Sequence, residues 1–257
     1  MKSFNKYGFF FKNMLIRNAF QYRTTQMHVR QQHFTTNIKH TMDLKTKLFL
    51  WCGVISSILF VTTFSIEGAT RIGYDPLRYP ISSLSIGMLG WIQITNFLVT
   101  GFFILAFAVG LRRTLRYSIG GVWGPLLIGF VGIGLIGGGI FSTDPVFGYP
   151  TNMPLLLKQQ SVHGHLHNIF SMLVFIGLPI ACFVFCRRFI ILRKPGWAAY
   201  SMLTAIAMPV TFILAGGGFD QVPELVEVGG ALQRVSVIIG WTWMALLSLH
   251  LLLTVDK

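Results

Sequence analysis

Six apolar stretches of about twenty residues each follow one another along the chain, separated by short polar segments. They cover residues 48–66, 91–111, 122–141, 168–186, 197–219 and 235–255. At about 1.5 Å per residue, a helix over each stretch spans roughly 30 Å, the hydrocarbon thickness of a bilayer. Backbone groups in lipid must be paired within the segment, and these stretches are too long for barrel strands. The pattern predicts an all-α polytopic membrane protein with six transmembrane helices.

Composition agrees with this class and narrows the architecture. Of 257 residues, 53% are hydrophobic and only 11% are charged, and the mean hydropathy is +0.63. These values exclude an ordinary soluble globular protein. Six spans also leave no room for a separate soluble catalytic domain. The net charge of +13 does not point to nucleic acid, because the sequence has no basic stripe interleaved with aromatic residues for stacking bases.

Basic residues concentrate in alternate loops, which predicts the orientation. If the N-terminus is cytoplasmic, seventeen Lys and Arg residues lie inside and four lie outside. The two short internal loops carry seven of them: Arg112, Arg113, Arg116, Arg187, Arg188, Arg193 and Lys194. Six of the eight acidic residues show the opposite bias, with only Asp43 and Asp256 inside. We therefore expect both termini in the cytoplasm.

Residues 1–42 differ in kind from the rest of the chain. They contain seven Lys or Arg residues and no Asp or Glu. Two interpretations fit: a start site placed too early in a bacterial protein, with Met42 as the true initiator, or a mitochondrial transit peptide. We favour the first and expect a basic, disordered leader, followed by a six-helix domain over 43–257. The membrane is then the inner membrane of a prokaryotic cell, or the mitochondrial inner membrane under the second interpretation.

The third apolar stretch is rich in glycine, with Gly134 and Gly138 in the spacing that lets two helices approach closely in lipid. Its end, 135–145, resembles the end of the fifth stretch, 214–220 with Pro223. Each ends in small residues, an aromatic residue and an acid. This echo is compatible with tandem helical hairpins.

Polar residues that could bind a ligand or take part in catalysis gather in the loops predicted to lie outside. We expect an extracytoplasmic pocket that binds a small polar solute or a lipid head group. Its candidate ligand-binding residues are Asp75, Arg78, Ser82, Asp144, His163, His167 and Arg234. Asp144 and Asp220 each follow a predicted helix C-terminus, where an anion is disfavoured, so Arg78 and Arg234 are their expected counterions.

A metal site is a second hypothesis for the same loops. His163 and His167 are four residues apart, so on a helix both imidazoles share one face, and Asp144 could supply a third ligand. Zinc held there would activate water for a membrane hydrolase acting on lipid at the outer face. The spacing alone is not specific, and we favour the interpretation that these histidines cap a helix start and form hydrogen bonds to loop carbonyls. Catalytic residues, protein partners and enzyme activity are left open.

The chain resembles the integral membrane proteins grouped as domain of unknown function 998. The motifs that carry the resemblance lie at 75–78, 80–84, 90–93, 96–101, 106–113, 123–127, 143–145, 163–167, 196–201 and 233–234. It extends over residues 48 to 253. It implies a multi-span bundle in a prokaryotic cell membrane and supplies no substrate, cofactor or activity. The family's recurrent positions correspond to the seven candidate pocket residues, whereas Asn168 stands where the family often has an acid.

Overall fold

The computed structural model describes residues 42–146, 148–150 and 159–254, and within them it contains six long α-helices, one 3-10 helix and no β-strand. The elements are α2 (Leu44–Thr70), η1 (Ile81–Ser85), α3 (Gly90–Leu115), α4 (Trp123–Ile140), α5 (Val162–Ile191), α6 (Pro195–Phe219) and α7 (Gly229–Thr254). Each α-helix is long and apolar enough to cross a membrane. The prediction of an all-α polytopic membrane protein with six spans is confirmed. The leader prediction falls on residues 1–41, outside the described part.

Several helices extend beyond the apolar stretches that predict them. Helix α5 begins at Val162 rather than 168, because the Ser161 hydroxyl caps it by accepting a bond of 3.0 Å from the Gly164 amide. Helix α7 begins at Gly229 rather than 235. Helical hydrogen bonding continues into the polar interface wherever caps satisfy the ends, whereas hydropathy marks only the hydrocarbon-embedded part. His163, His167 and Arg234 therefore lie on helices and not in loops.

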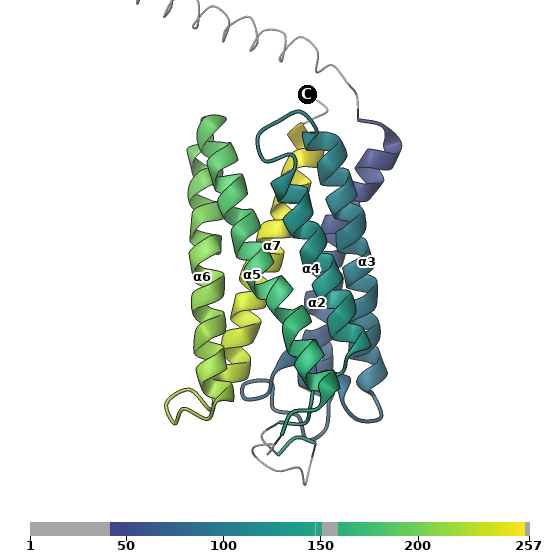
Figure 1. The fold of residues 1–257 in the computed structure, drawn as a ribbon, viewed down its shortest axis with the longest axis vertical. Coiled ribbons are helices and arrows are strands. Elements are labelled where there is room, and N and C mark those ends of the chain that lie inside the picture. The colour runs from purple at the N-terminus through teal and green to yellow at the C-terminus, as the bar shows by residue number, and fades with distance from the viewer. Residues whose placement is uncertain (1–41, 147, 151–158, 255–257) are drawn as a thin grey trace, which may run out of the picture. The chain divides into compact units, whose positions relative to one another are not determined.

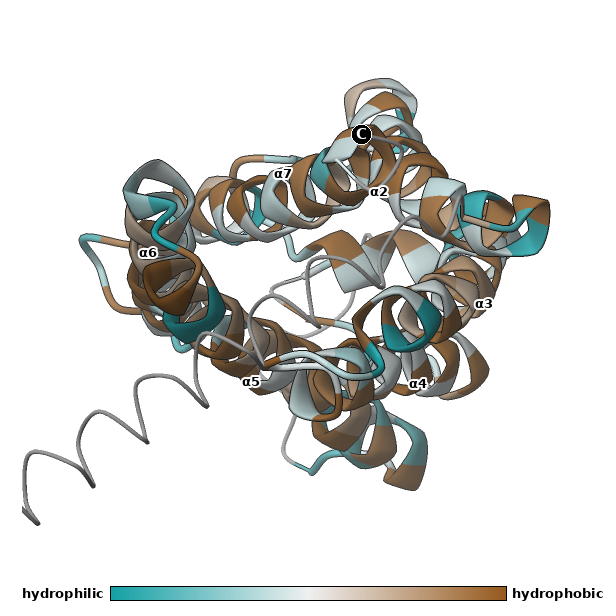
Figure 2. Ribbon diagram, turned by 90° about the horizontal axis from the view of Figure 1, so that it is seen from above, coloured by the Kyte–Doolittle hydropathy of each residue, from teal (hydrophilic) through white to brown (hydrophobic). Residues whose placement is uncertain are grey.

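The six helices form a closed ring (Figures 1 and 2). Each helix packs against the next one in the chain, and α7 returns to pack against α2. Polar side chains tie α7 to both of its neighbours. Ser236 donates to the Met208 carbonyl of α6 over 2.7 Å, and the Ser248 hydroxyl donates to the Leu50 carbonyl of α2. Such interhelical bonds are favourable in lipid, where no water competes for the same groups.

Glycines on opposite sides of α4 allow close contact with both of its neighbours. A Cβ atom added at Gly101 of α3 would lie 2.8 Å from the Gly132 carbonyl oxygen of α4. On the other side, a Cβ at Gly137 would lie 2.1 Å from the ring of Phe170 on α5. Side chains at these positions would force the helices apart. The glycine-rich stretch thus forms a central, tightly packed helix, as the sequence predicts.

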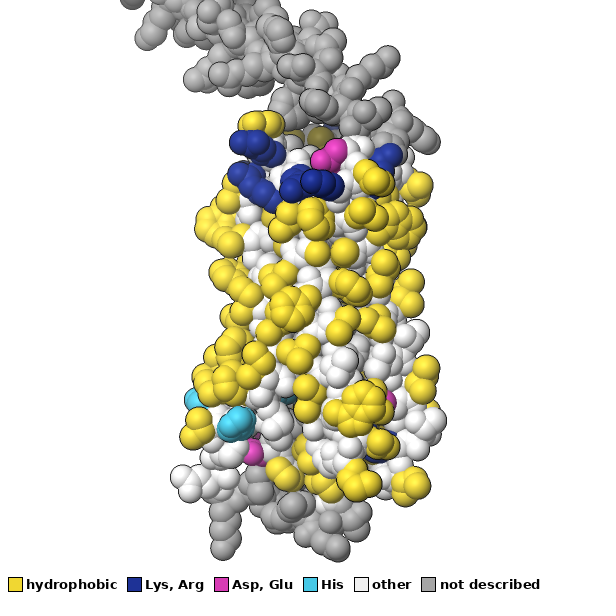
Figure 3. All heavy atoms as spheres, turned by 90° about the vertical axis from the view of Figure 1, so that its right-hand side faces the viewer, with side chains coloured by type: hydrophobic (Ala, Val, Ile, Leu, Met, Phe, Trp, Pro, Cys, Tyr) yellow, Lys and Arg dark blue, Asp and Glu magenta, His cyan; other side chains and the backbone are white. Residues whose placement is uncertain are grey.

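The two ends of the bundle differ in charge (Figure 3). Lys and Arg side chains gather at the end where α2 begins, and hydrophobic side chains cover the middle. The connector between α3 and α4 and the connector between α5 and α6 both lie at this basic end, since successive helices run in opposite directions. Most acidic residues described lie at the other end, called here the acidic end. This separation is the arrangement that the positive-inside rule requires, and the orientation itself stays a prediction.

Candidate functional site

A cavity of about 380 Å³ lies inside the helix ring and opens toward the acidic end. All six helices contribute to its wall, together with η1 and the start of the segment after α4. Its volume falls within the range typical of ligand sites, roughly 300–1,000 Å³. The deeper wall is aromatic and aliphatic, with Phe60, Phe97, Leu135, Phe175, Phe212, Val237 and Trp241. The polar lining includes Ser82, Thr143, Asp144, Gln160, His167, Asn168, Ser171, Asp220 and Gln233.

Asp144 is held by the beginning of α5. Its carboxylate accepts two hydrogen bonds from Ser161, one of 2.9 Å from the amide and one of 2.6 Å from the hydroxyl. A Cβ atom added at Gly164 would lie 2.1 Å from Asp144 Oδ2, so only glycine leaves room for the carboxylate there. The positive end of the α5 dipole favours the negative charge at this place. The helix N-terminus, rather than an arginine, therefore stabilises Asp144.

His167 connects α5 to the end of α4. It is 3% exposed, and its Nδ1 atom lies 3.0 Å from the Gly138 carbonyl oxygen and 2.8 Å from that of Phe141. Carbonyl oxygens only accept hydrogen bonds, so Nδ1 carries the proton and donates it. In a neutral imidazole this leaves Nε2 as an acceptor. Within the described residues Nε2 has no hydrogen-bond partner, and the side chain lines the cavity.

The structure brings three of the seven predicted pocket residues into the cavity wall and leaves four outside it. Ser82, Asp144 and His167 line the cavity. His163 is exposed, with its ring packed edge-on against Phe141 at 5.7 Å. Asp75 is exposed as well and closes a local turn, where its carboxylate accepts a bond of 2.9 Å from the Leu77 amide.

The two arginines expected as counterions have other partners. Arg78 forms an ion pair with Glu227 at 3.7 Å. The Arg234 guanidinium donates to the Tyr79 carbonyl over 3.0 Å and to the Tyr74 hydroxyl over 2.6 Å. It thereby joins the loop after α2 to the start of α7. Within the described residues neither arginine pairs with Asp144 or Asp220, so that expected pairing is wrong: Arg78 pairs with Glu227 of the connector before α7, and Arg234 is bonded to the loop after α2.

Tyr74 is the centre of this loop clamp. Its hydroxyl donates to the Pro80 carbonyl over 2.8 Å while it accepts from Arg234. Its ring packs against those of Tyr79 and Tyr149. Burial raises the pKa of Tyr74 to about 12, although the Arg234 charge acts in the opposite direction. The Tyr74 phenol is therefore neutral at ordinary pH, and it joins the positively charged Arg234 to the loop after α2.

The residues proposed as metal ligands do not come together in the described structure. Among the described residues, no group of three or more His, Cys, Asp or Glu side chains could hold a metal ion. His163 and His167 do share a helix, as the spacing predicts, but Nδ1 of His167 is bonded to two carbonyls while His163 lies exposed. The zinc site stays a prediction, and the hydrogen bonding of His167 to carbonyls is the interpretation that the geometry matches.

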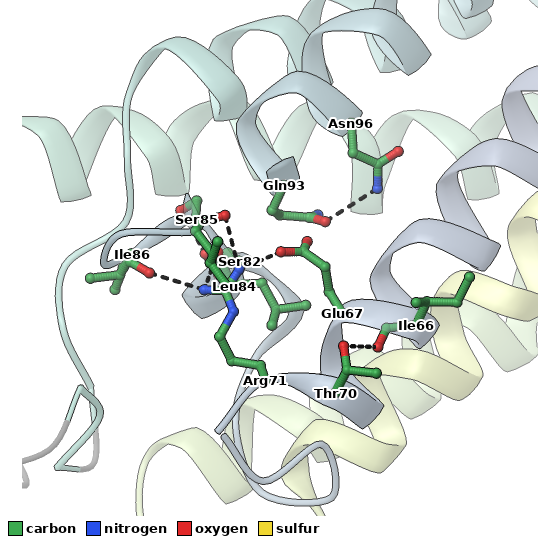
Figure 4. Close-up of polar contacts among 11 residues, drawn as sticks. Ile66, Glu67, Thr70, Arg71, Ser82, Leu84, Ser85, Ile86, Gln93 and Asn96 are labelled. Atoms are coloured by element: carbon green, nitrogen blue, oxygen red, sulfur yellow. Dashed lines mark hydrogen bonds and ion pairs between the residues drawn. The ribbon is translucent and has the colours of Figure 1, made fainter. Parts of the chain in front are cut away.

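A buried ion pair that the sequence analysis passed over lies beside the first loop (Figure 4). Glu67 lies in the last turn of α2, and Arg71 follows the helix directly. Their side chains contact each other and are only 7% and 8% exposed, respectively. Arg71 also donates to the carbonyls of Leu84, Ile86 and Leu89, at 3.0, 3.1 and 3.0 Å. It thus fixes the whole η1 segment against α2. An acid and a base spaced by four residues at the end of an apolar stretch were the available signal.

Polar side chains of α3 continue from this pair into the bundle. Asn96 donates to the Gln93 side chain over 3.2 Å and to the Phe60 carbonyl of α2 over 3.3 Å. Thr100 donates to Asn96 over 3.3 Å. The bond from Asn96 to Phe60 joins α3 to α2, whereas the bonds to Gln93 and from Thr100 lie within α3. Glu67 Oε2 and Gln93 Nε2, an acceptor and a donor, are both buried without a partner in the described part.

Residues 54–250 match a family described as Protein of unknown function (DUF998). The match covers well over half of the chain. The chain belongs to the DUF998 family. The resemblance drawn from the sequence motifs is confirmed. The described cavity lining and the Glu67–Arg71 pair lie within the matched DUF998 region, which covers the helix ring except for the start of α2 and the end of α7. Neither the curated proteins nor the solved structures include a significant match to the chain.

Proposed function

We propose that this DUF998 protein binds a small amphiphilic molecule, a lipid head group or a small polar solute, in the cavity of its helix ring. The single observation that carries the proposal is the division of one cavity into an aromatic deeper wall and a polar mouth. A ligand with one apolar and one polar part matches both regions. Sites for small molecules in helical bundles commonly have this composition, with a few polar groups set in an apolar wall.

The position of the cavity supports binding at the outer face of a prokaryotic cell membrane. The cavity opens at the acidic end, opposite the basic connectors that the positive-inside rule assigns to the cytoplasm. Ligand could enter there from the outer aqueous phase or from the outer leaflet. A role in transport or in assembly of membrane components follows most simply from such a site. A metal-dependent hydrolase is the weaker proposal, because the described residues bring no third His, Cys, Asp or Glu side chain together with others to hold a metal ion.

The proposal is tested by filling the cavity with a large side chain and measuring whether ligand binding is lost. Ser171 lies on α5 in the cavity wall, so Ser171→Trp should occupy the ligand space. Leu203 on α6 is 65% exposed at the apolar surface, and Leu203→Trp is the matched control. Native mass spectrometry and thermal shift would be measured with a panel of amphiphiles and polar solutes. We expect binding to the wild type and to Leu203→Trp but not to Ser171→Trp. Equal behaviour of all three proteins would refute the proposal.

A further inference from the structure

We infer that the ligand of this cavity is an organic cation, an amine or quaternary ammonium group attached to an apolar body. The inference rests on the proposed function and specifies the class of ligand. It comes from the charges, the hydrogen-bonding capacity and the aromatic surface that the cavity presents together. Each of these features selects the same chemistry.

Among the described residues, the charged groups in the cavity wall all carry one sign. Asp144 and Asp220 line the cavity, and no described Lys or Arg does. Within the described residues neither carboxylate has an ion pair. Asp220 also follows the C-terminal end of α6, where the helix dipole adds negative potential. In the described part of the chain, Asp144 is balanced by the α5 N-terminus and by its bonds to Ser161. A cationic ligand would supply the charge that the mouth lacks.

The imidazole in the wall adds an acceptor rather than a donor. Because Nδ1 of His167 donates to Gly138 and Phe141, its Nε2 atom has an available lone pair. Two carboxylates and this nitrogen therefore form a set of hydrogen-bond acceptors. A protonated primary amine carries three N–H donors and no acceptor, so it complements such a set. A phosphate or carboxylate head group would meet like charge at the two carboxylates. The side-chain amides of the lining and the Trp241 indole N–H can donate to either kind of ligand, so the carboxylates make the difference.

The deeper wall suits a cation as well as an apolar chain. Five aromatic rings line it: Phe60, Phe97, Phe175, Phe212 and Trp241. Phe60 stacks on Trp241 at 5.0 Å, and Phe175 stacks on Phe212 at 3.6 Å. Aromatic faces attract ammonium groups, with Trp the strongest, and this is the common means of recognising quaternary ammonium ligands. A cavity with carboxylates at the mouth and aromatic rings below can therefore hold an ammonium group partly removed from water.

The three described arginines at the same end have partners outside the cavity. Arg71 is bonded to Glu67 and three carbonyls, Arg78 pairs with Glu227, and Arg234 is held by the Tyr74 clamp. None of these three side chains lines the cavity. The positions of the described charges thus favour a cationic head group: the arginines stabilise the loops, whereas Asp144 and Asp220 line the cavity.

The experiment compares three probes with the same alkyl chain: an alkylammonium, the neutral alkanol and the alkanoate, each below its micelle-forming concentration. Dissociation constants would be measured on the purified full chain in a neutral detergent. We expect the alkylammonium to bind about tenfold more tightly than the alkanol, and the alkanoate more weakly than either. Added salt should reduce this preference, because part of it is electrostatic.

Two variants test whether the preference for the alkylammonium probe comes from the cavity. Asp220→Asn removes one mouth charge, and the described part of the chain gives that side chain no hydrogen bond or ion pair to lose. It should reduce the alkylammonium preference severalfold. Glu224→Gln makes the same charge change at an exposed position outside the cavity and should leave the preference intact. The test uses Asp220 because the Asp144 carboxylate holds the start of α5, so a variant of Asp144 could fail to fold.

The outcomes separate this inference from the function on which it rests. If all three probes bind equally, or the alkanoate binds best, the cation inference is wrong while cavity binding stands. If no probe binds the wild type, or if the probes stabilise the wild type no more than they stabilise Ser171→Trp, the proposed function fails as well. If Glu224→Gln changes the preference as much as Asp220→Asn does, the effect comes from general surface charge and the cation inference is again overturned.

Discussion

His167 on α5 donates a hydrogen bond from Nδ1 to the backbone carbonyl of Phe141, 2.8 Å away at the end of α4. The carbonyls in the last turn of a helix have no partner within the helix. Here a side chain from the following helix supplies one, and the same contact includes Gly138 at 3.0 Å. The bond holds α4 and α5 together at the cavity mouth. It also fixes the tautomer that turns the second ring nitrogen into an acceptor.

Replacing His167 should destabilise the bundle unless the donor is kept. His167→Leu leaves two buried carbonyls without their donor, so we expect a loss of about 1–3 kcal/mol in the free energy of unfolding. His167→Asn places an amide nitrogen near the position of Nδ1 and should recover much of that loss. His165→Ala, at an exposed position on the same helix, is the control and should change little. Melting temperatures in detergent measure all three.

Alkaline pH should weaken the fold through Tyr74. Its folded pKa of about 12 lies above the ordinary value of 10.0, so the folded state keeps its phenolic proton while the unfolded state loses it. Stability from this group is complete below pH 10.0 and falls as the pH rises toward 12, by at most about 3 kcal/mol. Tyr74→Phe should be less stable at neutral pH and show a shallower alkaline decline. Parallel alkaline slopes for the two proteins would contradict this assignment.

Breaking the Glu67–Arg71 pair from one side should cost more than removing both charges. Arg71→Met leaves the Glu67 carboxylate buried and three loop carbonyls without a donor, and we expect a loss of about 3–5 kcal/mol. The double variant Glu67→Gln with Arg71→Met should recover part of it. A double-mutant cycle from denaturation in micelles gives the coupling energy. A coupling near zero would show that the pair does not stabilise the first loop.

Two helix-interior glycines should respond oppositely to alanine. At Gly101 the added Cβ would lie 2.8 Å from the Gly132 carbonyl oxygen, so Gly101→Ala should separate α3 from α4 and cost about 1–3 kcal/mol. At Gly216 no described atom outside the adjoining α6 backbone lies within 4 Å of the added Cβ. Gly216→Ala should therefore be neutral or stabilise α6 by up to about 1 kcal/mol. Thermal unfolding of both variants checks the pair.

The orientation can be measured directly with single cysteines in a variant that lacks Cys52, Cys182 and Cys186. Glu224 is exposed at the acidic end, and Tyr117 is 78% exposed in the connector between α3 and α4. An impermeant maleimide added to intact cells should label Glu224→Cys but not Tyr117→Cys. Labelling both after membrane disruption is the control. The reverse pattern would place the cavity mouth in the cytoplasm.

The sequence by itself determined the number of spans, their approximate positions and the family. These features depend on local properties: the length of an apolar stretch against the bilayer thickness, the position of basic loops and short motifs. Helix ends were less well predicted, because caps such as Ser161 extend helices into polar segments that hydropathy does not mark. The apolar pattern does not distinguish residues that face a cavity from those that face lipid or a neighbouring helix. It therefore did not identify Phe60, Phe175 and Trp241 as cavity-lining residues.

Only the tertiary structure decided which polar groups meet. Asp144 and Arg234 both lie at the acidic end, yet one is held by Ser161 and the other by Tyr74. The rotation of each helix about its axis, set by packing such as that of Gly137 against Phe170, decides whether a side chain points to the cavity, a neighbour or the surface. Sequence fixes the depth of a residue in the membrane through local hydrophobicity, whereas its partners depend on contacts between helices far apart in the chain.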